Sequence, residues 1–528
     1  MKNSILKTAS LMIIFNLLSK VLGFLRDYFT AVKFGTTIQA DAYLMASNIP
    51  NVLFVIIGGA IATTIIPIYN EIKYNAENEE LEKFTSNIIT ILLIVSLILT
   101  ICCELFAPQL VIIMAPGFIG YKYTLTVLLT RILASVIILN TLIYVFTAIL
   151  QCENNFSLPA SIGIPYNIIL IIYFILFINK FGVVGLSIVV SMALIIQICI
   201  LRYALKKVKF KYKFYLNFKD KNLNKILTLI VPICIGTGMT QINGVFNGIY
   251  ASSLDSGSVA AINYALKLNA LIVDIIIVSI TTIIYQNLTK VIANGENKEL
   301  HKETNKSILT MFIVLMPIVI IAIMYNEYIV KFLFQRGAFN SESTIMTAKA
   351  FYYYAFGLFA IAINNILSRV CYSLGDTKTP MINTFLAILV NIATGFILKD
   401  ILGVGGIALA STIGSIVSMI VLYFNVNKKI KNCISKDTVI SIVKLFISCI
   451  PLILIIMYSK EYIVKINSNN VLLEFMKMGI TSILGSAIYV YGGILLKINQ
   501  FSELKKILDK FKKQSKQILV SFFVGSQK

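Results

Sequence analysis

The chain has 528 residues, of which 58% are hydrophobic and only 13% are charged, and its mean hydropathy is +0.86. A water-soluble protein of this length could not keep so much apolar surface out of water, so the composition predicts an all-α polytopic membrane protein. In a soluble chain the formal net charge of +22 would favour nucleic acid. Here the basic residues gather in particular loops, so we interpret them as topology determinants and expect no nucleic-acid partner.

Hydropathy predicts about fourteen membrane spans, several of them longer than a bilayer needs. They lie near residues 10–34, 38–70, 86–106, 120–150, 159–179, 183–205, 226–251, 257–292, 307–325, 344–374, 380–399, 403–426, 438–459 and 472–496. Lys and Arg concentrate in the loop after the sixth span, in the loop after the twelfth and in the tail beyond residue 497. The positive-inside rule therefore predicts a multi-pass plasma-membrane protein with both termini in the cytoplasm. The basic tail is either a helix on the anionic inner leaflet or a solvated segment.

The first span carries a polar stripe within an arc of roughly 120° at ~100° per residue. Its members are Asn16, Ser19, Lys20, Gly23, Arg26, Asp27 and Thr30. A charge near the bilayer centre costs ~2.5–3.5 kcal/mol on insertion scales, so we expect the stripe to face a water-filled cavity or a partner. The alternative for Arg26 and Asp27 is an ion pair that reaches the membrane interface near a helix end.

Similar stripes occur on three other spans. The second span has Asp41 and Asn48, and the seventh has Thr240, Asn243 and Asn247. The eighth has Asn263, Lys267, Asp274 and Thr281. If all stripes point inward, three cations and three carboxylates share one cavity. Such a basic cluster favours an anionic group such as phosphate. The candidate substrate-binding residues are Arg26, Lys267, Lys20, Ser19, Asn48, Asn243 and Asn247. The candidate charge partners or coupling groups are Asp27, Asp41 and Asp274, and pairing of Lys267 with Asp274 is a purely structural alternative.

The sequence matches itself at a shift of 221 residues. Pro159 meets Pro380, and the glycines at 182 and 185 meet those at 403 and 406. Each repeat holds six spans, an even number, so we predict two parallel lobes around a central cavity. The predicted divisions are 1–225 for the first lobe with its basic linker, 226–436 for the second lobe, 437–497 for two additional transmembrane helices and 498–528 for the tail.

No enzyme motif is present. A Walker A sequence is missing, and the lone His301 in a polar loop excludes a His-based catalytic or metal cluster, so we expect no catalytic residue, metal or cofactor. The membrane potential or an ion gradient is the candidate energy source. Transport is the default function for paired lobes with inward polar stripes.

Several segments resemble motifs of the MurJ (MviN) lipid II flippases, which belong to the MOP exporter superfamily. The first-helix motif is Ser19-Lys20-Val21-Leu22-Gly23-Phe24-Leu25-Arg26-Asp27, and later ones are Asp41-Ala42-Tyr43, Ile49-Pro50-Asn51, Ala115-Pro116-Gly117-Phe118, Asn155-Phe156-Ser157-Leu158-Pro159, Gly257-Ser258, Asn263-Tyr264, Phe334-Gln335-Arg336-Gly337-Ala338-Phe339 and Tyr372-Ser373-Leu374-Gly375-Asp376-Thr377-Lys378-Thr379-Pro380. They follow the family's order across roughly the first 425 residues.

The resemblance implies a flippase that carries an undecaprenyl-pyrophosphate-linked disaccharide-pentapeptide from the inner to the outer leaflet, for peptidoglycan synthesis. It implies alternating access, a groove for the lipid tail on the last two helices, and cell-wall synthesis proteins as partners. Arg26 takes the basic position of the first-helix motif, and Lys267 takes an Arg position of the eighth helix. The chain departs from the family after Asn51, where an Arg and a Glu are missing. Lys20 is the candidate third positive charge.

Two other functions stay open at this point. One is a flippase for another lipid-linked oligosaccharide, of the capsule or teichoic type, against which the first-helix motif and the Gly375–Pro380 loop argue. The other is a MATE-like cation-coupled exporter, which predicts twelve spans and a cavity richer in carboxylates. A non-transporting scaffold would have little use for buried charges.

Overall fold

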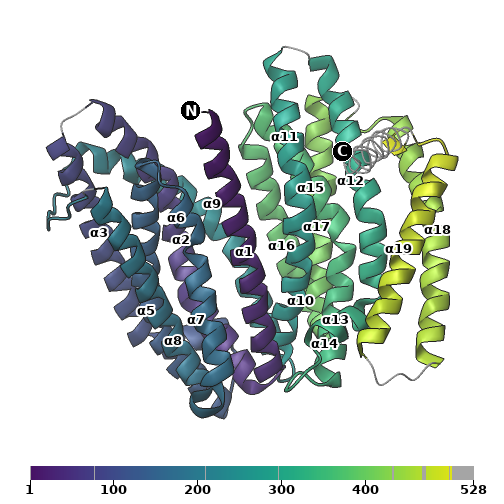
Figure 1. Cartoon of the computed structure of the whole chain (residues 1–528), viewed down its shortest axis with the longest axis horizontal. Helices are drawn as coiled ribbons and strands as arrows, with labels where there is room; N and C mark the ends of the chain where they lie inside the picture. Colours follow the sequence, from purple (N-terminus) through teal and green to yellow (C-terminus); the bar gives the residue numbers. More distant parts are fainter. Residues whose placement is uncertain are drawn as a thin grey trace, which may run out of the picture. The chain divides into compact units, whose positions relative to one another are not determined.

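The computed structural model describes residues 2–75, 78–208, 210–294, 297–430, 433–465, 471–498 and 500–501 (Figure 1). Every regular element in these residues is a helix, which confirms the all-α prediction. The helices are α1 (Lys2–Phe34), α2 (Ile38–Asn75), α3 (Asn78–Leu105), α4 (Ala107–Met114), α5 (Gly120–Cys152), α6 (Ser157–Ser161), α7 (Gly163–Leu176), α8 (Ile178–Lys207), α9 (Lys221–Ser252), α10 (Ser258–Ile272), the π-helical turn η1 (Val273–Ile277), α11 (Val278–Ala293), α12 (Asn297–Met324), α13 (Asn326–Phe334), α14 (Ser341–Phe356), α15 (Leu358–Ser373), α16 (Lys378–Leu402), α17 (Val404–Lys429), α18 (Lys436–Lys465) and α19 (Val471–Leu495).

The described helices confirm a multi-pass membrane protein. Ten continuous helical segments are long and apolar enough to cross a bilayer, and the pair α14 and α15, bent by 41°, makes an eleventh. The other three predicted spans correspond to α1, α2 and α9, which have 33, 38 and 32 residues. Each is longer than the ~20 residues that a membrane crossing requires. The total of fourteen spans stays a prediction, and nearly all of the basic tail lies outside the described residues.

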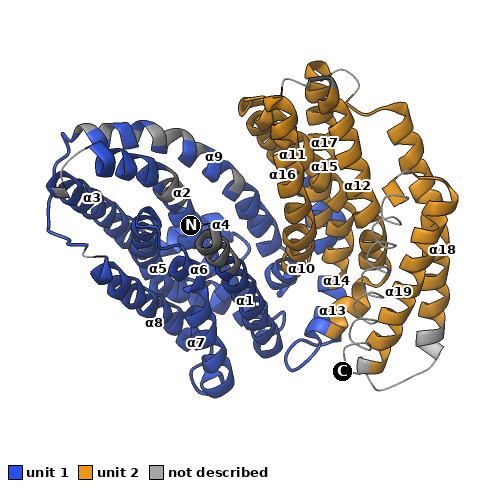
Figure 2. Ribbon diagram, turned by 45° about the horizontal axis from the view of Figure 1, so that its top comes forward, with its two compact units in different colours: residues 1–264, 333–347, 391–407 blue, residues 265–332, 348–390, 408–528 orange. Residues whose placement is uncertain are grey.

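The chain forms two compact units that are not consecutive along the sequence (Figure 2). Unit 1 contains Met1–Tyr264, Leu333–Thr347 and Asn391–Ile407. Unit 2 contains Ala265–Phe332, Ala348–Val390 and Ala408–Lys528. The predicted division into two lobes, two additional helices and a tail follows chain order and stays a prediction.

The shift of 221 residues recurs in the backbone. Asn154 and Gly375 both have left-handed backbones, with φ of +59° and +75°. The residue after each, Asn155 or Asp376, accepts a hydrogen bond through its side chain from the backbone N–H three positions further along the chain. Gly182 and Gly403 also share the left-handed region, with φ of +56° and +60°. Glycine has no Cβ to penalise this conformation, so both halves of the repeat break the chain in the same way at the same place.

Unit 1 is built on α2, which packs against α5 and α9, while α5 packs on α8 and α1 packs on α6 and α7. The contact of α1 is close because small residues face it. A Cβ on Gly163 would collide with Ser19 Oγ, and Gly23 lies against the Asn167 amide. Small residues let membrane helices approach, since lipid tails offer no hydrophobic driving force for their association.

Unit 2 is held by helix packing and by polar contacts between helices. The two C-terminal helices α18 and α19 pack on each other, and α18 packs on α12. The Tyr325 hydroxyl, just after α12, is hydrogen-bonded to Ser459 and, at 2.9 Å, to Thr481. Lys331 Nζ lies 2.7 Å from Glu474 Oε2. Buried hydroxyls that find partners across helices keep α18 and α19 attached to the rest of unit 2.

Candidate functional site

Arg26, on the predicted stripe of α1, is held by a set of polar contacts within unit 1. Its Nη2 and Nε donate to Asp27 Oδ1 at 2.8 and 3.1 Å, and its Nη1 donates to Asn167 Oδ1 at 3.2 Å. The guanidinium carbon lies 5.8 Å from the centre of the Tyr166 ring. The Arg26 side chain is therefore held in place by these contacts while 25% of its surface stays exposed.

The amide of Asn167 is itself fixed by α1 and α7. Its Nδ2 donates to the carbonyls of Ser19 at 3.2 Å and Gly163 at 2.9 Å. Two donated bonds turn the amide so that its oxygen faces Arg26. Sequence reasoning found Ser19 and Arg26 but missed Asn167 and Tyr166. A polar Asn in the apolar fifth span was the available signal, because such a residue usually bonds across helices.

The second half of the repeat has a counterpart of this contact. Asn247 occupies the position equivalent to Arg26 at the shift of 221, and its Oδ1 accepts from Asn391 Nδ2 at 3.1 Å. Asn391 also donates to Asn243. Asn243 and Asn247, predicted as substrate ligands, are thus bonded to a side chain of α16. In each half of the repeat, an Asn side chain thus contacts the helix that begins that half: Asn167 contacts α1 and Asn391 contacts α9. Only the contact in the first half includes a cation, Arg26.

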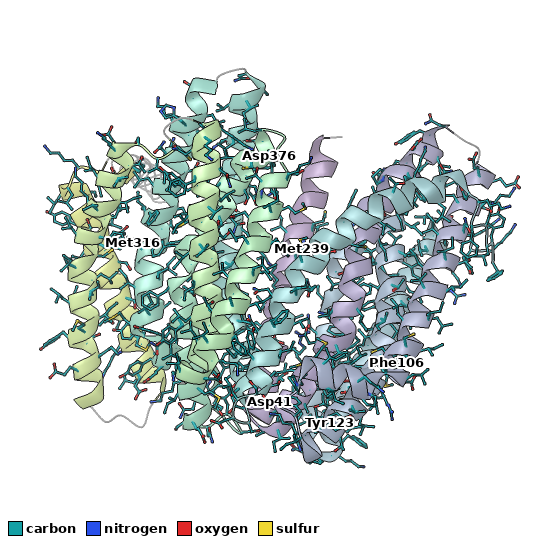
Figure 3. The ribbon with its side chains drawn as sticks, turned by 180° about the vertical axis from the view of Figure 1, so that it is seen from behind. Asp41, Phe106, Tyr123, Met239, Met316 and Asp376 are labelled. Carbon is teal, nitrogen blue, oxygen red and sulfur yellow. The ribbon has the colours of Figure 1, made fainter. Side chains whose placement is uncertain are left out.

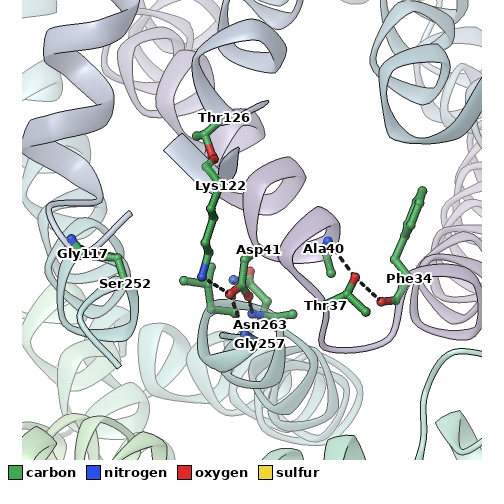
Figure 4. A network of polar contacts seen from close by, with 12 residues as sticks. Phe34, Thr37, Ala40, Asp41, Gly117, Lys122, Thr126, Ser252, Gly257 and Asn263 are labelled. Atoms are coloured by element: carbon green, nitrogen blue, oxygen red, sulfur yellow. Dashed lines mark hydrogen bonds and ion pairs between the residues drawn. The ribbon is translucent and has the colours of Figure 1, made fainter. Parts of the chain in front are cut away.

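Asp41 lies at the start of α2, beside Lys122 and Gly257 (Figure 4), and it is completely buried. Its Oδ2 accepts from Lys122 Nζ at 2.6 Å and from the Gly257 N–H at 2.7 Å, and its Oδ1 accepts from the Ala260 N–H at 2.8 Å. The two backbone donors come from the first turn of α10 and the residue before it. An anion there is stabilised because these N–H groups have no intrahelical acceptor.

Because Asp41 is buried, its role differs from that of a carboxylate facing a water-filled cavity. The carboxylate joins three segments of unit 1, α2, α5 and α10, and its cation is Lys122, which sequence reasoning did not consider as a partner. Lys122 is 12% exposed, and its ammonium also lies 4.1 Å from the centre of the Phe118 ring. The nearby Ala115-Pro116-Gly117-Phe118 motif was the available signal for this site. Asp41 is therefore a charge partner of Lys122 within the fold.

The remaining candidates have the following places. Lys20 is exposed on α1, Asn48 is half-buried on α2, and Lys267 and Asp274 are exposed in unit 2. Asp274, seven residues after Lys267, lies in the π-helical turn η1, which interrupts the helix. Such turns occur often at functional sites, because the extra residue re-aims the side chains that follow. The sequence pattern gave no indication of this turn.

The motif from Gly375 to Pro380 forms the connection into α16 (Figure 3 labels Asp376). Asp376 Oδ1 accepts from the Thr379 N–H at 3.0 Å, and Oδ2 pairs with Lys429 at the end of α17. Lys429 and the hydrogen bonds from Thr379 hold the pKa of Asp376 well below its usual range. The carboxylate is thus charged at any physiological pH and ties two helices of unit 2 together. No group of three His, Cys, Asp or Glu suited to a metal occurs among the described residues.

Comparison with known proteins extends over nearly the whole chain. The sequence model of the family described as "Lipid II flippase MurJ" matches residues 30–473. A "Probable lipid II flippase MurJ" of Rickettsia prowazekii is 28% identical over 93% of this chain and 97% of that protein. One from Buchnera aphidicola subsp. Acyrthosiphon pisum is 31% identical over 77% of this chain and 80% of that protein.

Two solved structures show the same fold. A lipid II flippase MurJ in an inward closed conformation superposes with a TM-score of 0.73 at 25% identity, covering 92% of this chain and 99% of that one. An inward-facing multidrug resistance MATE transporter of the MOP superfamily superposes with a TM-score of 0.66 at 16% identity, covering 80% of this chain and 98% of that one. Because the family model spans most of the chain and the relatives are matched over most of their length, this protein belongs to the MurJ family.

Proposed function

We propose that this protein is a lipid II flippase, which moves the undecaprenyl-pyrophosphate-linked peptidoglycan precursor from the inner to the outer leaflet by alternating access. One observation carries the choice over a MATE-like exporter. The MATE structure superposes on 80% of this chain. The MurJ structure superposes on 92% of this chain, and 99% of the MurJ structure is matched. The solved lipid II flippase thus accounts for more of this chain than the MATE transporter does.

The direct test is complementation of a strain depleted of its own lipid II flippase. Expression of this chain should restore growth and cell shape. A flippase for capsule or teichoic precursors, or a drug exporter, would leave the depleted strain unable to grow. Purified protein in vesicles should then transfer labelled lipid II across the bilayer.

For the substrate contacts, we propose that Arg26 and Lys267 both bind the pyrophosphate, with Lys20 as a further cation. Ser19, Asn48, Asn243 and Asn247 are proposed as polar contacts to the rest of the head group. Arg26 has support from the hydrogen bonds that hold its guanidinium and from the 25% exposure of its side chain. A charge-assisted hydrogen bond contributes roughly 1.5–3 kcal/mol, or about tenfold or more in affinity.

The proposal predicts a graded result at Lys267. Lys267→Arg should be tolerated, because Arg keeps the charge and adds donors. Lys267→Ala should impair complementation at a normal protein level in the membrane. The matched control is Lys290→Ala, which removes another exposed lysine from the same helical segment and should grow like the parent. Full growth of an Arg26→Ala, Lys267→Ala double variant would contradict pyrophosphate binding by these two residues.

We further propose that the protein lies in the bacterial plasma membrane with both termini in the cytoplasm. In this proposal the protein needs no cofactor and has no catalytic residue. The membrane potential or an ion gradient drives the transport cycle. Asp27, Asp41 and Asp274 are the candidates for coupling that energy source to transport. Cell-wall synthesis proteins on the outer side would receive the product. The basic loop after α8 supports this orientation.

Cysteine labelling tests the orientation. In a variant whose eight native cysteines are replaced by alanine, Lys219→Cys in the loop after α8 should resist an impermeant thiol reagent in intact cells. Glu342→Cys, exposed in the first turn of α14, should react under the same conditions. Both should react after permeabilisation, which serves as the control. The reverse pattern in intact cells would overturn the orientation. Lys209, in the same basic loop, lies outside the described residues.

A further inference from the structure

Between α8 and α9 the chain runs as an extended segment, residues 210–220, which we call the strap. The strap lies along the N-terminal half of α3 (Figure 1). Asn87 holds it through two hydrogen bonds to the backbone of Asn217, at 2.8 and 2.9 Å. Ser86 accepts from the Lys213 N–H at 3.3 Å, and the hydroxyls of Thr90 and Tyr212 lie 3.0 Å apart. The strap therefore has a defined course across α3.

The burial of α3 confirms that the strap covers it. The seven consecutive residues Phe84–Thr90 are all buried, so every face of this part of the helix is covered. Phe84, Ile88 and Ile89 belong to the core cluster of unit 1, whereas Ser86, Asn87 and Thr90 contact the strap. A membrane helix ordinarily leaves its outer face to lipid. Near the N-terminal end of α3, the strap covers this face in place of lipid.

Most of the exposed residues of the strap are of two kinds. They are the lysines 211, 213 and 219 and the aromatic residues Tyr212, Phe214, Tyr215 and Phe218. Phe214 is 76% exposed and Phe218 is 64% exposed. Two phenylalanine side chains exposed to this extent on an ordered surface are unusual in water. Because the strap joins the ends of two membrane helices, its position coincides with the membrane–water interface, where aromatic rings and lysines are the preferred residues.

We propose that the strap is a binding surface for anionic phospholipids. The phenyl rings enter the interface, and the lysine ammonium groups contact the lipid phosphates. Charge complementarity favours anionic over zwitterionic lipids, since a basic residue near an anionic surface contributes an attraction worth roughly fivefold in binding. Lipid binding here is independent of the proposed transport function. Only the assignment to the cytoplasmic leaflet rests on the orientation proposed above.

Fluorescence quenching tests the proposal, because the sequence contains no tryptophan. Phe214→Trp introduces a single indole on the strap. The purified full chain is reconstituted in mixed phosphatidylglycerol and phosphatidylcholine vesicles in which an equal molar amount of either lipid carries bromine on its acyl chains. We expect quenching by brominated phosphatidylglycerol to be about threefold stronger or more than quenching by brominated phosphatidylcholine.

Two controls keep the result specific. Phe106→Trp places the indole at the opposite end of α3, at a 53% exposed position, and should be quenched equally by both lipids. Replacing lysines 211, 213 and 219 by Gln should abolish the preference at position 214, whereas the same change at Lys290, Lys302 and Lys306 should leave it intact. Absence of quenching by either lipid, equal quenching by both, or a preference that survives loss of the strap lysines would overturn the proposal. Transport by the strap variants is measured separately, so failure of this proposal leaves the flippase assignment unaffected.

Discussion

Asp41→Asn is expected to destabilise the protein by about 3–5 kcal/mol, the usual effect of removing one partner of a buried ion pair. The loss is large because the Lys122 ammonium would stay in a site where it is only 12% exposed, with no carboxylate beside it. The amide also accepts less strongly from the N–H groups of Gly257 and Ala260. The protein level in the membrane and the melting temperature in detergent should both fall.

A second variant separates the ion pair from other effects. Adding Lys122→Met to Asp41→Asn removes the uncompensated cation, so part of the stability should return. The matched control is the exposed Glu79–Lys83 pair, whose charged atoms lie 2.7 Å apart, close to the 2.6 Å between Lys122 and Asp41. Glu79→Gln should leave the melting temperature nearly unchanged, because exposed ion pairs contribute little to stability. Normal stability of Asp41→Asn together with a loss of transport would show instead that this carboxylate acts in coupling.

Arg26→Ala is expected to abolish complementation while the protein still reaches the membrane. Its side chain is partly open, and its partners Asp27 and Asn167 keep other contacts or solvent access, so the fold should tolerate the change better than it tolerates loss of Asp41. Loss of one charge-assisted contact to pyrophosphate should weaken substrate binding by about tenfold or more. Lipid II binding by the purified variant gives the direct measurement.

Arg26→Lys should also fail, because a point charge cannot keep contacts to Asp27 and Asn167 while presenting donors to a phosphate. Lys33→Ala, which removes a cation at the end of the same helix, should complement like the parent. Asn167→Ala should give an intermediate defect that lies in the affinity for lipid II, since it removes one hydrogen bond that positions the guanidinium but leaves its charge and its contacts to Asp27. Normal lipid II binding by Arg26→Ala would exclude the proposed contact.

The sequence by itself determined the membrane class, the all-helical fold and the internal repeat. Those features depend on composition, on hydropathy and on local backbone preferences, all of which are properties of residues that are neighbours along the chain. The repeat predicted from Gly182 and Gly403 reappears as two left-handed backbones. The polar stripe around Arg26 also followed from helical periodicity, which gives the face of a side chain but not what lies opposite to it.

Only the tertiary structure decided which groups meet. Lys122 lies 81 positions from Asp41, and Asn167 lies 141 positions from Arg26, so neither pairing follows from any spacing along the chain. The open side of Arg26, the complete burial of Asp41 and the strap across α3 all arise from the packing of helices distant in sequence. An ion pair and a substrate-binding charge use the same residue types, and their difference lies in solvent exposure, which packing alone sets.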